Sequence, residues 1–250
     1  MNSPKLDVSI IIPAFNEEGR LPKTLEAVIA YVRTRPYRTE IMVVDDGSSD
    51  RTTEIVNSYQ QKYPGLRLIS NGRNRGKGYS VRHGMLEATG EIALFSDADL
   101  STPIEEADKL LAAIRERNFD AAIGSRAMDR SLIQIHQSAI REMAGIFFNR
   151  MVQRILGIRI SDTQCGFKAF RREPAHIIFE QQHIERFGFD PEILFLAKRH
   201  GLRVAEIPVR WSHDAATKVN VAADGLLMFL ELILIRWNAI RGLYPASRRP

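Results

Sequence analysis

The stretch Glu91-Ile92-Ala93-Leu94-Phe95-Ser96-Asp97-Ala98-Asp99-Leu100 joins a short apolar run to two acidic residues spaced one residue apart. The apolar run predicts a buried β-strand. Because side chains alternate faces along a strand, Asp97 and Asp99 point the same way and could converge on one point. Converging carboxylates repel unless a cation lies between them, and Mg²⁺ or Mn²⁺ prefers such hard oxygen ligands. The competing interpretation is a solvated acidic turn between a strand and a helix.

Outward from this stretch, the first half of the chain alternates short apolar runs with helix-patterned runs. Continuous apolar strands are typical of a parallel sheet covered on both faces, so the alternation predicts an open, mostly parallel α/β sheet. Ligands of such sheets bind beyond the carboxyl ends of the strands, where the polar motifs of this chain fall. We expect strands at 8–12, 40–44, 66–69, 92–95 and 121–123, and helices at 21–32, 52–63, 78–88 and 104–117.

The second half has fewer alternations. We expect a long helix at 137–156, a strand at 167–170, a helix at 190–200 and a strand at 204–209.

The last periodic segment, 222–243, is very apolar, but Glu231 interrupts it and Arg236 closes its apolar run. A membrane span needs about 20 predominantly apolar residues. We therefore expect an amphipathic helix at a membrane interface, with a core-packing or dimer helix as the alternative. The expected division is a globular domain at 1–221 and an amphipathic helix with a basic tail at 222–250.

Composition and charge indicate an ordinary globular protein and disfavour a nucleic-acid-binding one. The 250 residues are 44% hydrophobic and 26% charged, which is ordinary for a globular protein, and the formal net charge is +5. Anionic lipids or phosphorylated small molecules fit this charge better than nucleic acid, because no helix-turn-helix, zinc-finger or RNP-like pattern is present. The single cysteine, Cys165, excludes an intrachain disulfide and is expected to be buried. The N-terminus shows no signal-peptide pattern.

Polar residues follow the first two expected strands. Pro13-Ala14-Phe15-Asn16-Glu17-Glu18 ends the first, and Asp45-Asp46-Gly47-Ser48-Ser49-Asp50 ends the second. Asp45 or Asp46 could accept a hydrogen bond from a nucleotide base or a ribose hydroxyl. Helix capping by Ser48, Ser49 or Asp50 is the simpler interpretation, and both can hold.

The third strand leads into Asn71-Gly72-Arg73-Asn74-Arg75-Gly76-Lys77-Gly78, a cationic, glycine-rich loop that enters a helix. Backbone N–H groups at a helix start, together with arginine and lysine side chains, suit phosphate oxygens. The loop matches neither the Walker A pattern nor Gly-x-Gly-x-x-Gly, so dinucleotide binding is unsupported.

Four of these segments, in this order and each at a strand exit, resemble the family 2 inverting glycosyltransferases with a GT-A fold: Pro-Ala-Phe-Asn-Glu-Glu, Val-Val-Asp-Asp-Gly-Ser, Asn-Arg-Gly-Lys-Gly and Asp-Ala-Asp-Leu. Gly124-Ser125-Arg126 and Arg141 ahead of Asn149 are similar to the polyprenyl-phosphate hexosyltransferases. The run 162–168, Asp-Thr-Gln-Cys-Gly-Phe-Lys, with Phe-Asp-Pro-Glu at 189–192, is most similar to the dolichyl-phosphate β-glucosyltransferases. Dolichyl-phosphate mannose synthases are close relatives. The resemblance covers residues 7–220.

The resemblance implies a nucleotide-sugar donor and a divalent metal, Mg²⁺ or Mn²⁺. Asp97 and Asp99 match the pair that holds the metal and the donor diphosphate. Ser101 stands where mannose synthases can place a glutamine on the metal. The implied donor-binding residues are Pro13, Ala14, Asn16, Glu17, Asp45, Asp46, Lys77, Asp97 and Ala98.

The acceptor implied by the resemblance is a polyprenyl phosphate. Arg126 and Arg141 match residues that bind its phosphate, although ordinary surface charges are the alternative. Lys218 matches the lysine of a loop that usually reads Gly-x-Ser-Lys in this family. In this chain, Ala215 stands in place of the glycine of that loop. Gln164 is a further candidate.

The implied activity is inverting transfer of a hexose to the lipid phosphate by a peripheral protein on the cytoplasmic face of a membrane. UDP-glucose is the favoured donor and GDP-mannose the rival. A phosphate monoester has a second pKa of about 6, so this nucleophile needs positioning more than a general base. A saccharide hydroxyl would instead need a carboxylate base, Asp190 or Glu192, although Asp190 is also expected to cap the following helix.

A nucleotide-sugar-binding protein that has lost turnover is the non-enzymatic alternative. The intact set of Asp97, Asp99, Arg126 and Arg141 disfavours it.

Overall fold

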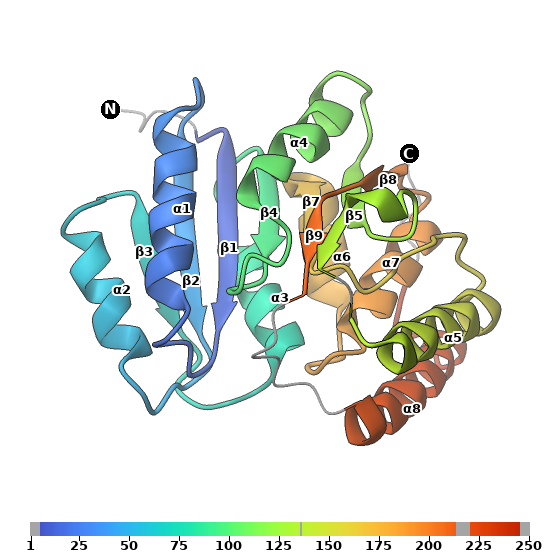
Figure 1. Cartoon of the computed structure of the whole chain (residues 1–250). Helices are drawn as coiled ribbons and strands as arrows, with labels where there is room; N and C mark the ends of the chain where they lie inside the picture. The colour runs from blue at the N-terminus through green and yellow to red at the C-terminus, as the bar shows by residue number, and fades with distance from the viewer. Residues whose placement is uncertain (1–5, 136, 214–220, 246–250) are drawn as a thin grey trace.

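The protein is described by a computed structural model that covers residues 6–135, 137–213 and 221–245 (Figure 1). It confirms the predicted α/β class: over these residues a sheet of seven strands is flanked by helices. The strands of this sheet are β1 (Val8–Ala14), β2 (Thr39–Asp45), β3 (Leu66–Ser70), β4 (Ile92–Ser96), β5 (Ala121–Ser125), β7 (Phe167–Arg171) and β8 (Val204–Pro208).

Except for α6, which was not predicted, the helices follow the expected periodic segments closely. They are α1 (Leu21–Arg33), α2 (Thr52–Gln60), α3 (Lys77–Glu87), α4 (Ala107–Arg115), α5 (Ala139–Leu156), α6 (Arg172–Gln181), α7 (Phe189–Arg199) and α8 (Val221–Ile240). Shorter elements are β6 (Ile133–Ile135), β9 (Trp211–Ser212) and the 3₁₀ turns at Ile104–Glu106 and Arg130–Leu132.

The strand order of the sheet is β3-β2-β1-β4-β7-β5-β8. All neighbouring strands are parallel except β7, which runs antiparallel to both β4 and β5. The chain leaves β1 for β2 and β3 on one side and returns to pair β4 with β1 on the other. The crevice beyond the carboxyl ends of β1 and β4 is therefore a topological switch point, where ligands of open α/β sheets bind.

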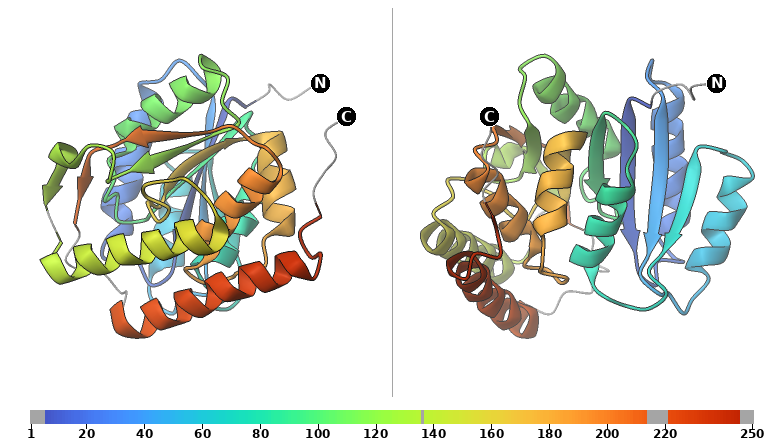
Figure 2. Two further views of the ribbon diagram at one scale, coloured as in Figure 1. Left: turned by 90° about the vertical axis from the view of Figure 1, so that its right-hand side faces the viewer. Right: turned by 180° about the vertical axis from the view of Figure 1, so that it is seen from behind.

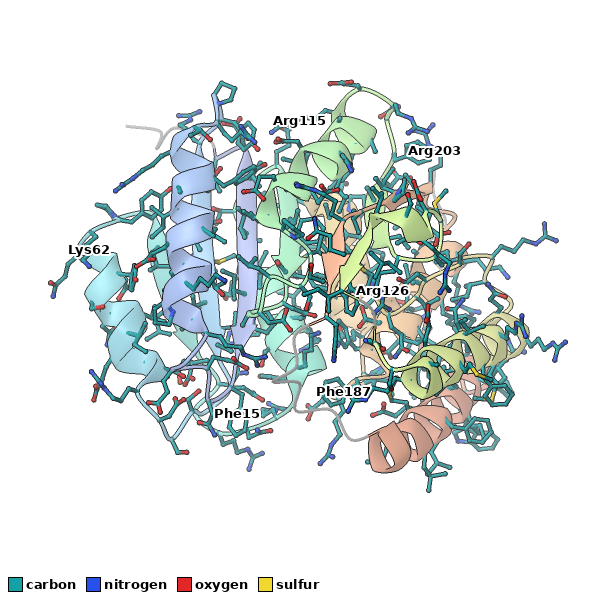
Figure 3. The ribbon with its side chains drawn as sticks, viewed as in Figure 1. Phe15, Lys62, Arg115, Arg126, Phe187 and Arg203 are labelled. Atoms are coloured by element: carbon teal, nitrogen blue, oxygen red, sulfur yellow. The ribbon has the colours of Figure 1, made fainter. Side chains whose placement is uncertain are left out.

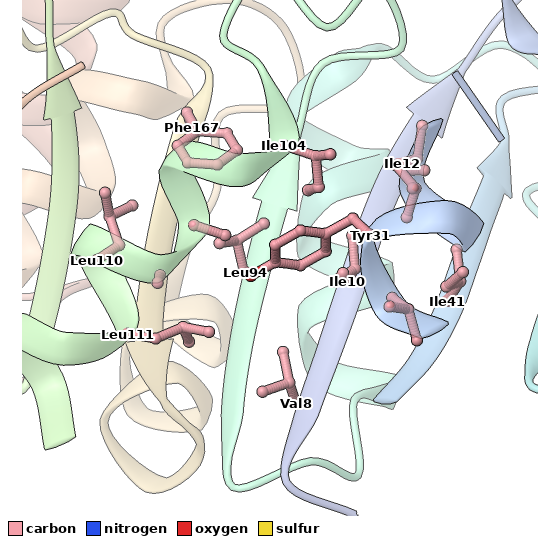
Figure 4. Packing of buried hydrophobic residues seen from close by; sticks show 14 of the residues in the cluster. Val8, Ile10, Ile12, Tyr31, Ile41, Leu94, Ile104, Leu110, Leu111 and Phe167 are labelled. Carbon is pink, nitrogen blue, oxygen red and sulfur yellow. The ribbon is translucent and has the colours of Figure 1, made fainter. Parts of the chain in front are cut away.

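Alternation along β1 divides the core into two layers. Ile10 and Ile12 point to one face of the sheet, which α1, α2 and α4 cover (Figure 4). Ile11 points to the opposite face, where α3, α5, α6, α7 and α8 pack (Figure 2). Both faces are buried, which explains why the strands read as continuous apolar runs. Cys165 is buried, as expected.

Helix α8 lies beside α5, and its inner face joins the second core layer through Met228, Leu232 and Ile235. Helix α8 begins at Val221, and the expected division at residues 221–222 stays a prediction. Its outer face is apolar and exposed. Within the described residues, no helix is long and apolar enough to span a membrane.

One predicted helix start is wrong. Helix α7 begins at Phe189 with Gly188 as its N-cap, so Asp190 lies inside the first turn and does not cap it. The reason is that the Asp190 side chain turns inward to a buried lysine, Lys168.

Candidate active site

A cavity of about 410 Å³ opens at the switch point, where β1, β2 and β4 end. Phe15 and Phe187 lie at this edge of the molecule, below the strand ends in Figure 3. We call it the donor cavity. Its volume falls in the range of small-ligand sites, about 300–1,000 Å³. It is lined by Pro13, Ala14, Phe15, Glu17, Arg20, Asp46, Asn74, Gly76, Lys77, Ser80, Asp97, Ala98, Asp99, Arg186 and Phe187.

Most of the predicted donor residues therefore come together at this cavity. Asn16 and Asp45 do not line it, but they shape its loops. Asn16, with φ of 54°, accepts the Ser49 backbone N–H at 2.8 Å, and Asp45 accepts the Ser48 N–H at 3.2 Å. Neither serine caps the following helix: the N-cap of α2 is Arg51, without a side-chain cap hydrogen bond, and Asp50 accepts the Thr52 N–H at 2.9 Å.

Asp46 organises the glycine-rich loop. Its carboxylate accepts the backbone N–H groups of Arg75 at 3.1 Å and Gly76 at 2.8 Å. It also accepts the side-chain amide of Asn71 at 2.8 Å. The positive φ of Gly76, 110°, lets the chain turn sharply into α3. The carboxylate thereby fixes the position of Lys77, the first residue of that helix.

Lys77 and Asp97 form an ion pair at the donor cavity, in which the lysine Nζ lies 2.5 Å from the carboxylate Oδ1. Burial alone would lower the pKa of the Lys77 ammonium, but the surrounding carboxylates, Asp97 above all, raise it above its usual value. The lysine therefore stays charged in the site.

Burial, and then the negative charge of Asp97, raises the pKa of Asp99 above its usual range. Asp99 also accepts the Ser101 N–H at 2.9 Å and lies 4.0 Å from the Arg20 guanidinium. Two carboxylates that repel each other can both bind one divalent cation, and such oxygen ligands suit Mg²⁺ or Mn²⁺. In the described part of the chain no group of three acidic, histidine or cysteine side chains gathers around one point.

Gly166 holds Asp97 from the other side. A side-chain carbon at this position would overlap both carboxylate oxygens of Asp97, so only glycine leaves room for the carboxylate where it lies. Gly166 belongs to the 162–168 run that links the site to β7.

A second cavity, of about 310 Å³, adjoins the donor cavity and shares Lys77, Asp97, Asp99 and Phe187 with it. We call it the acceptor cavity. Five further predicted residues line it: Ser101, Arg126, Arg141, Gln164 and Asp190. Glu192 does not line it. A smaller pocket of about 120 Å³ continues from it alongside α5 and shares both arginines.

Arg126 is fixed by a buried carboxylate. Its Nε and Nη2 donate to the two oxygens of Asp162 at 2.7 and 2.8 Å, and its backbone N–H donates to the same group at 2.9 Å. Burial opposes the charge on Asp162, but the guanidinium of Arg126 keeps the pKa of that carboxyl below its usual range. The Trp211 ring lies 5.4 Å from the guanidinium carbon. These contacts orient the arginine toward the acceptor cavity.

Arg141 lies in the first turn of α5 and lines the acceptor cavity and the pocket that continues from it. It forms no ion pair with any carboxylate that the structure describes. Gln164 lines the same two cavities, with its side-chain amide 3.8 Å from the Met228 sulfur of α8. The arginine charge is therefore available to an anion in the cavity.

The two acidic residues of the 189–192 segment are separated. Asp190 lines the acceptor cavity and pairs with the buried ammonium of Lys168, which also donates to the Cys165 carbonyl at 2.6 Å. Glu192 lines none of these cavities. It accepts the backbone N–H groups of His183 and Ile184, each at 2.9 Å, on the far side of α7. Lys218 lies outside the described residues.

Seven residues that line the donor cavity were not among the predicted site residues: Phe15, Arg20, Asn74, Gly76, Ser80, Arg186 and Phe187. Arg20 follows Glu17 by three residues, and its guanidinium donates twice to that carboxylate at 2.7 Å. That spacing is a usable sequence signal. Arg186 and Phe187 come from a connection between α6 and α7 that carries no motif.

Comparison with known proteins agrees with this geometry. A family model described as glycosyl transferase family 2 matches residues 9–179. A dolichyl-phosphate beta-glucosyltransferase of Trichomonas vaginalis is 37% identical over 244 residues, which cover 94% of this chain and 74% of the relative. The enzyme of that name from Saccharomyces cerevisiae is 36% identical over 260 residues, covering 97% and 78%.

A solved structure shares the fold at low sequence identity. Glucosyl-3-phosphoglycerate synthase from Mycobacterium tuberculosis, in complex with Mn²⁺, UDP and glucosyl-3-phosphoglycerate, superposes with a TM-score of 0.65 at 18% identity. The match covers 98% of this chain and 82% of that one.

Proposed function

Because the chain belongs to glycosyltransferase family 2, we propose that it transfers glucose from UDP-glucose to a polyprenyl or dolichyl phosphate, with inversion at the anomeric carbon. One observation carries the acceptor assignment: the cavity that contains Arg126 and Arg141 adjoins the one that contains Asp97 and Asp99. A phosphate bound by the arginines would therefore lie next to a diphosphate bound at the carboxylates.

The donor assignment rests on the donor cavity and on the relatives. Its base and ribose side is formed by the ends of β1 and β2, and its diphosphate side by Asp97, Asp99 and Lys77. The similarity to dolichyl-phosphate beta-glucosyltransferases favours glucose over mannose.

A divalent metal is part of the proposal. Bound Mg²⁺ or Mn²⁺ would supply positive charge for the leaving nucleoside diphosphate. Asp97 and Asp99 would hold it, while Lys77 keeps a fixed positive charge beside them. Gly166 keeps Asp97 in place.

The acceptor needs no general base. A phosphate monoester with a second pKa of about 6 is already largely anionic at neutral pH. Guanidinium groups bind phosphate oxygens in pairs, and Asp162 holds Arg126 in one orientation for this purpose. Asp190, the candidate base for a hydroxyl acceptor, is paired with Lys168, which favours its role as a fixed charge.

We also propose that the protein binds a membrane surface through α5 and α8. The exposed outer sides of these neighbouring helices are apolar, and Arg150, Arg154, Arg236 and Arg241 are exposed on or next to them. Apolar side chains flanked by basic ones suit a bilayer with anionic lipids. The exposed apolar residues are Met143, Ile146, Phe147, Leu226, Leu227, Leu230, Ile233, Leu234, Trp237 and Ile240. A lipid-bound phosphate would thus be presented next to the acceptor cavity.

A transfer assay tests the proposal. Purified protein is mixed with Mn²⁺ and a short polyprenyl phosphate, and UDP-glucose and GDP-mannose are supplied in parallel. We expect a lipid-linked hexose from UDP-glucose, with β configuration if the donor is α-linked. Product from GDP-mannose alone would replace glucose by mannose, and transfer only to saccharides would overturn the lipid acceptor.

A further inference from the structure

The connection between α6 and α7, residues 182–188, forms one wall of the donor cavity. We call it the 182–188 loop. Arg186 and Phe187 line the donor cavity, and Phe187, which is labelled in Figure 3, also lines the acceptor cavity. Within the described parts of the chain, the Arg186 guanidinium forms no ion pair with a carboxylate, and it lines a cavity that Lys77 also lines.

The loop is held on one side by the start of α3. The Tyr79 N–H donates to the Glu185 carbonyl at 3.0 Å, and the Gln182 side chain donates to the Gly78 carbonyl at 2.9 Å. A side-chain carbon on Gly76 would come within 2.5 Å of that same Glu185 oxygen. The backbones are therefore in direct contact, and this side of the loop moves with the helix that carries Lys77.

The other side of the loop is held by α8. Glu231 of that helix accepts the backbone N–H of Gly188 at 2.8 Å through Oε2. Gly188 is the N-cap of α7, and a carboxylate at the positive end of a helix is stabilising. A side-chain carbon on Gly188 would come within 2.5 Å of Oε2, so the contact is close as well as polar.

Glu231 is an unusual residue for its position. It is the one charged residue between Gly225 and Ile235, and its neighbours Leu230 and Ile233 are exposed on the apolar side of α8. Glu231 is only partly exposed, and burial raises its pKa above the usual value. Desolvating a carboxylate is costly unless it is hydrogen-bonded. The hydrogen bond from Gly188, and after it the positive charge of Arg186, offset this cost.

We infer that Glu231 is a positioning residue for the nucleotide donor: by holding Gly188, it fixes the wall that Arg186 and Phe187 form beside the donor diphosphate. This inference rests on the proposed function, because it takes the ligand of the donor cavity to be a nucleoside diphosphate sugar. Helix α8 would then have two roles: its outer face binds a membrane surface, and Glu231 positions the wall of the donor cavity.

The test measures nucleotide affinity and donor kinetics in variants of the full chain. Glu231→Leu removes the acceptor, Glu231→Gln keeps a carbonyl oxygen, and Gly188→Ala disturbs the same contact from the other side. Glu173→Gln, which removes an exposed charge from α6, is the matched control. UDP and GDP are titrated separately in the presence of Mn²⁺, and thermal unfolding is recorded for each variant.

We expect Glu231→Leu and Gly188→Ala to bind the nucleotide about tenfold more weakly and to raise the donor KM, with the acceptor KM unchanged. Glu231→Gln should restore affinity to within about threefold of the parent, and Glu173→Gln should match it. Equal nucleotide affinity in a folded Glu231→Leu or Gly188→Ala protein would overturn the inference, as would an equal loss of acceptor affinity. A parent protein that binds nucleotide without transferring sugar would overturn the proposed function alone. A parent that binds neither nucleotide would overturn both.

Discussion

At the scale of a single residue, the surroundings of Asp99 and its proposed metal-binding role favour different protonation states. Burial and the charge of Asp97 disfavour its ionised form, whereas metal binding requires it. We predict that Asp99→Asn lowers kcat for sugar transfer at least about 100-fold, because a metal ligand contributes several kcal/mol to the stabilisation of the leaving group. The asparagine oxygen can still accept the Ser101 N–H, and the repulsion from Asp97 is removed.

Thermal unfolding of the Asp99→Asn protein should therefore occur at or above the parent temperature. Turnover at the parent rate would contradict the metal assignment.

Gly166 gives a second prediction at this scale. Gly166→Ala should displace the Asp97 carboxylate, since the new methyl group overlaps both of its oxygens. We expect metal-dependent transfer to fall by about 100-fold or more, with a change in unfolding free energy of about 1–3 kcal/mol. Gly19→Ala is the matched control, because nothing lies within 4 Å of the added carbon. Similar activity in the two variants would show that Asp97 tolerates displacement.

The sequence identified most residues of the site, because each motif follows a strand and parallel strands end at one edge of the sheet. It did not identify how the residues support one another. The pairing of Arg126 with Asp162 spans 36 positions, and that of Lys168 with Asp190 spans 22. Such pairs follow from tertiary packing, which no local pattern encodes.

At the scale of elements, the segment that follows α8 is tied to α7 by a buried hydrogen bond. The Tyr244 hydroxyl donates to Glu192 at 2.6 Å, and both side chains are fully buried. Burial raises the pKa of Glu192 from 4.5 to about 7, despite the N–H and hydroxyl donors around it. The folded state therefore holds this proton more tightly than the unfolded chain does.

The sign of the pH effect follows from this difference. Between about pH 4.5 and 7 the folded state binds more protons at Glu192, so the group's contribution to stability is complete below that window and is lost as pH rises through it. The loss is at most about 3 kcal/mol. We predict that Tyr244→Phe lowers the free energy of unfolding by about 1–3 kcal/mol, and by more at pH 8 than at pH 5, because hydroxyl bonds to ionised carboxylates are stronger.

Denaturant unfolding at the two pH values measures this effect. An identical loss at pH 5 and pH 8 would show that Glu192 keeps one protonation state across the range.

Helices and strands were predicted correctly where the periodic pattern covers a long segment. They were missed or misplaced where tertiary contacts determine the structure of a short segment. Helix α6 escaped notice because its sequence, Arg172–Gln181, is short and polar and contains Pro174. Strands β6 and β9 have only three and two residues and pair with each other, so neither carries a pattern of its own. The start of α7 was misplaced because Asp190 serves Lys168 instead of the helix end.

At the scale of the whole molecule, the apolar outer sides of α5 and α8 lie next to each other. We predict that Leu230→Gln combined with Phe147→Gln reduces binding to vesicles that contain anionic lipid by about tenfold, since each exposed apolar side chain contributes about 1.5–3 kcal/mol when fully buried and less at an interface.

Vesicle sedimentation measures the change. Transfer to a short, soluble polyprenyl phosphate serves as the control and should be retained. Unchanged sedimentation of the double variant would assign this surface to another role.

The amphipathic helix was predicted from its sequence, but its partnership with α5 was not. The periodicity of one helix shows that it has an apolar side, and it does not show which other helix extends that side. In the same way, the sequence flagged Glu231 only as an interruption, and its contact with Gly188 became visible once α7 and α8 were placed together.

The place of β7 in the sheet has a consequence for how the chain is made. This strand fills the gap between β4 and β5, yet it is synthesised after both. Roughly 40 residues separate β5 from β7, and at ~5–20 residues per second the ribosome needs about 2 to 8 s to add them. During that interval the facing edges of β4 and β5 have no partner strand, and such edges invite pairing with other chains. Productive folding of this molecule therefore depends on protecting a half-built sheet until the antiparallel strand emerges.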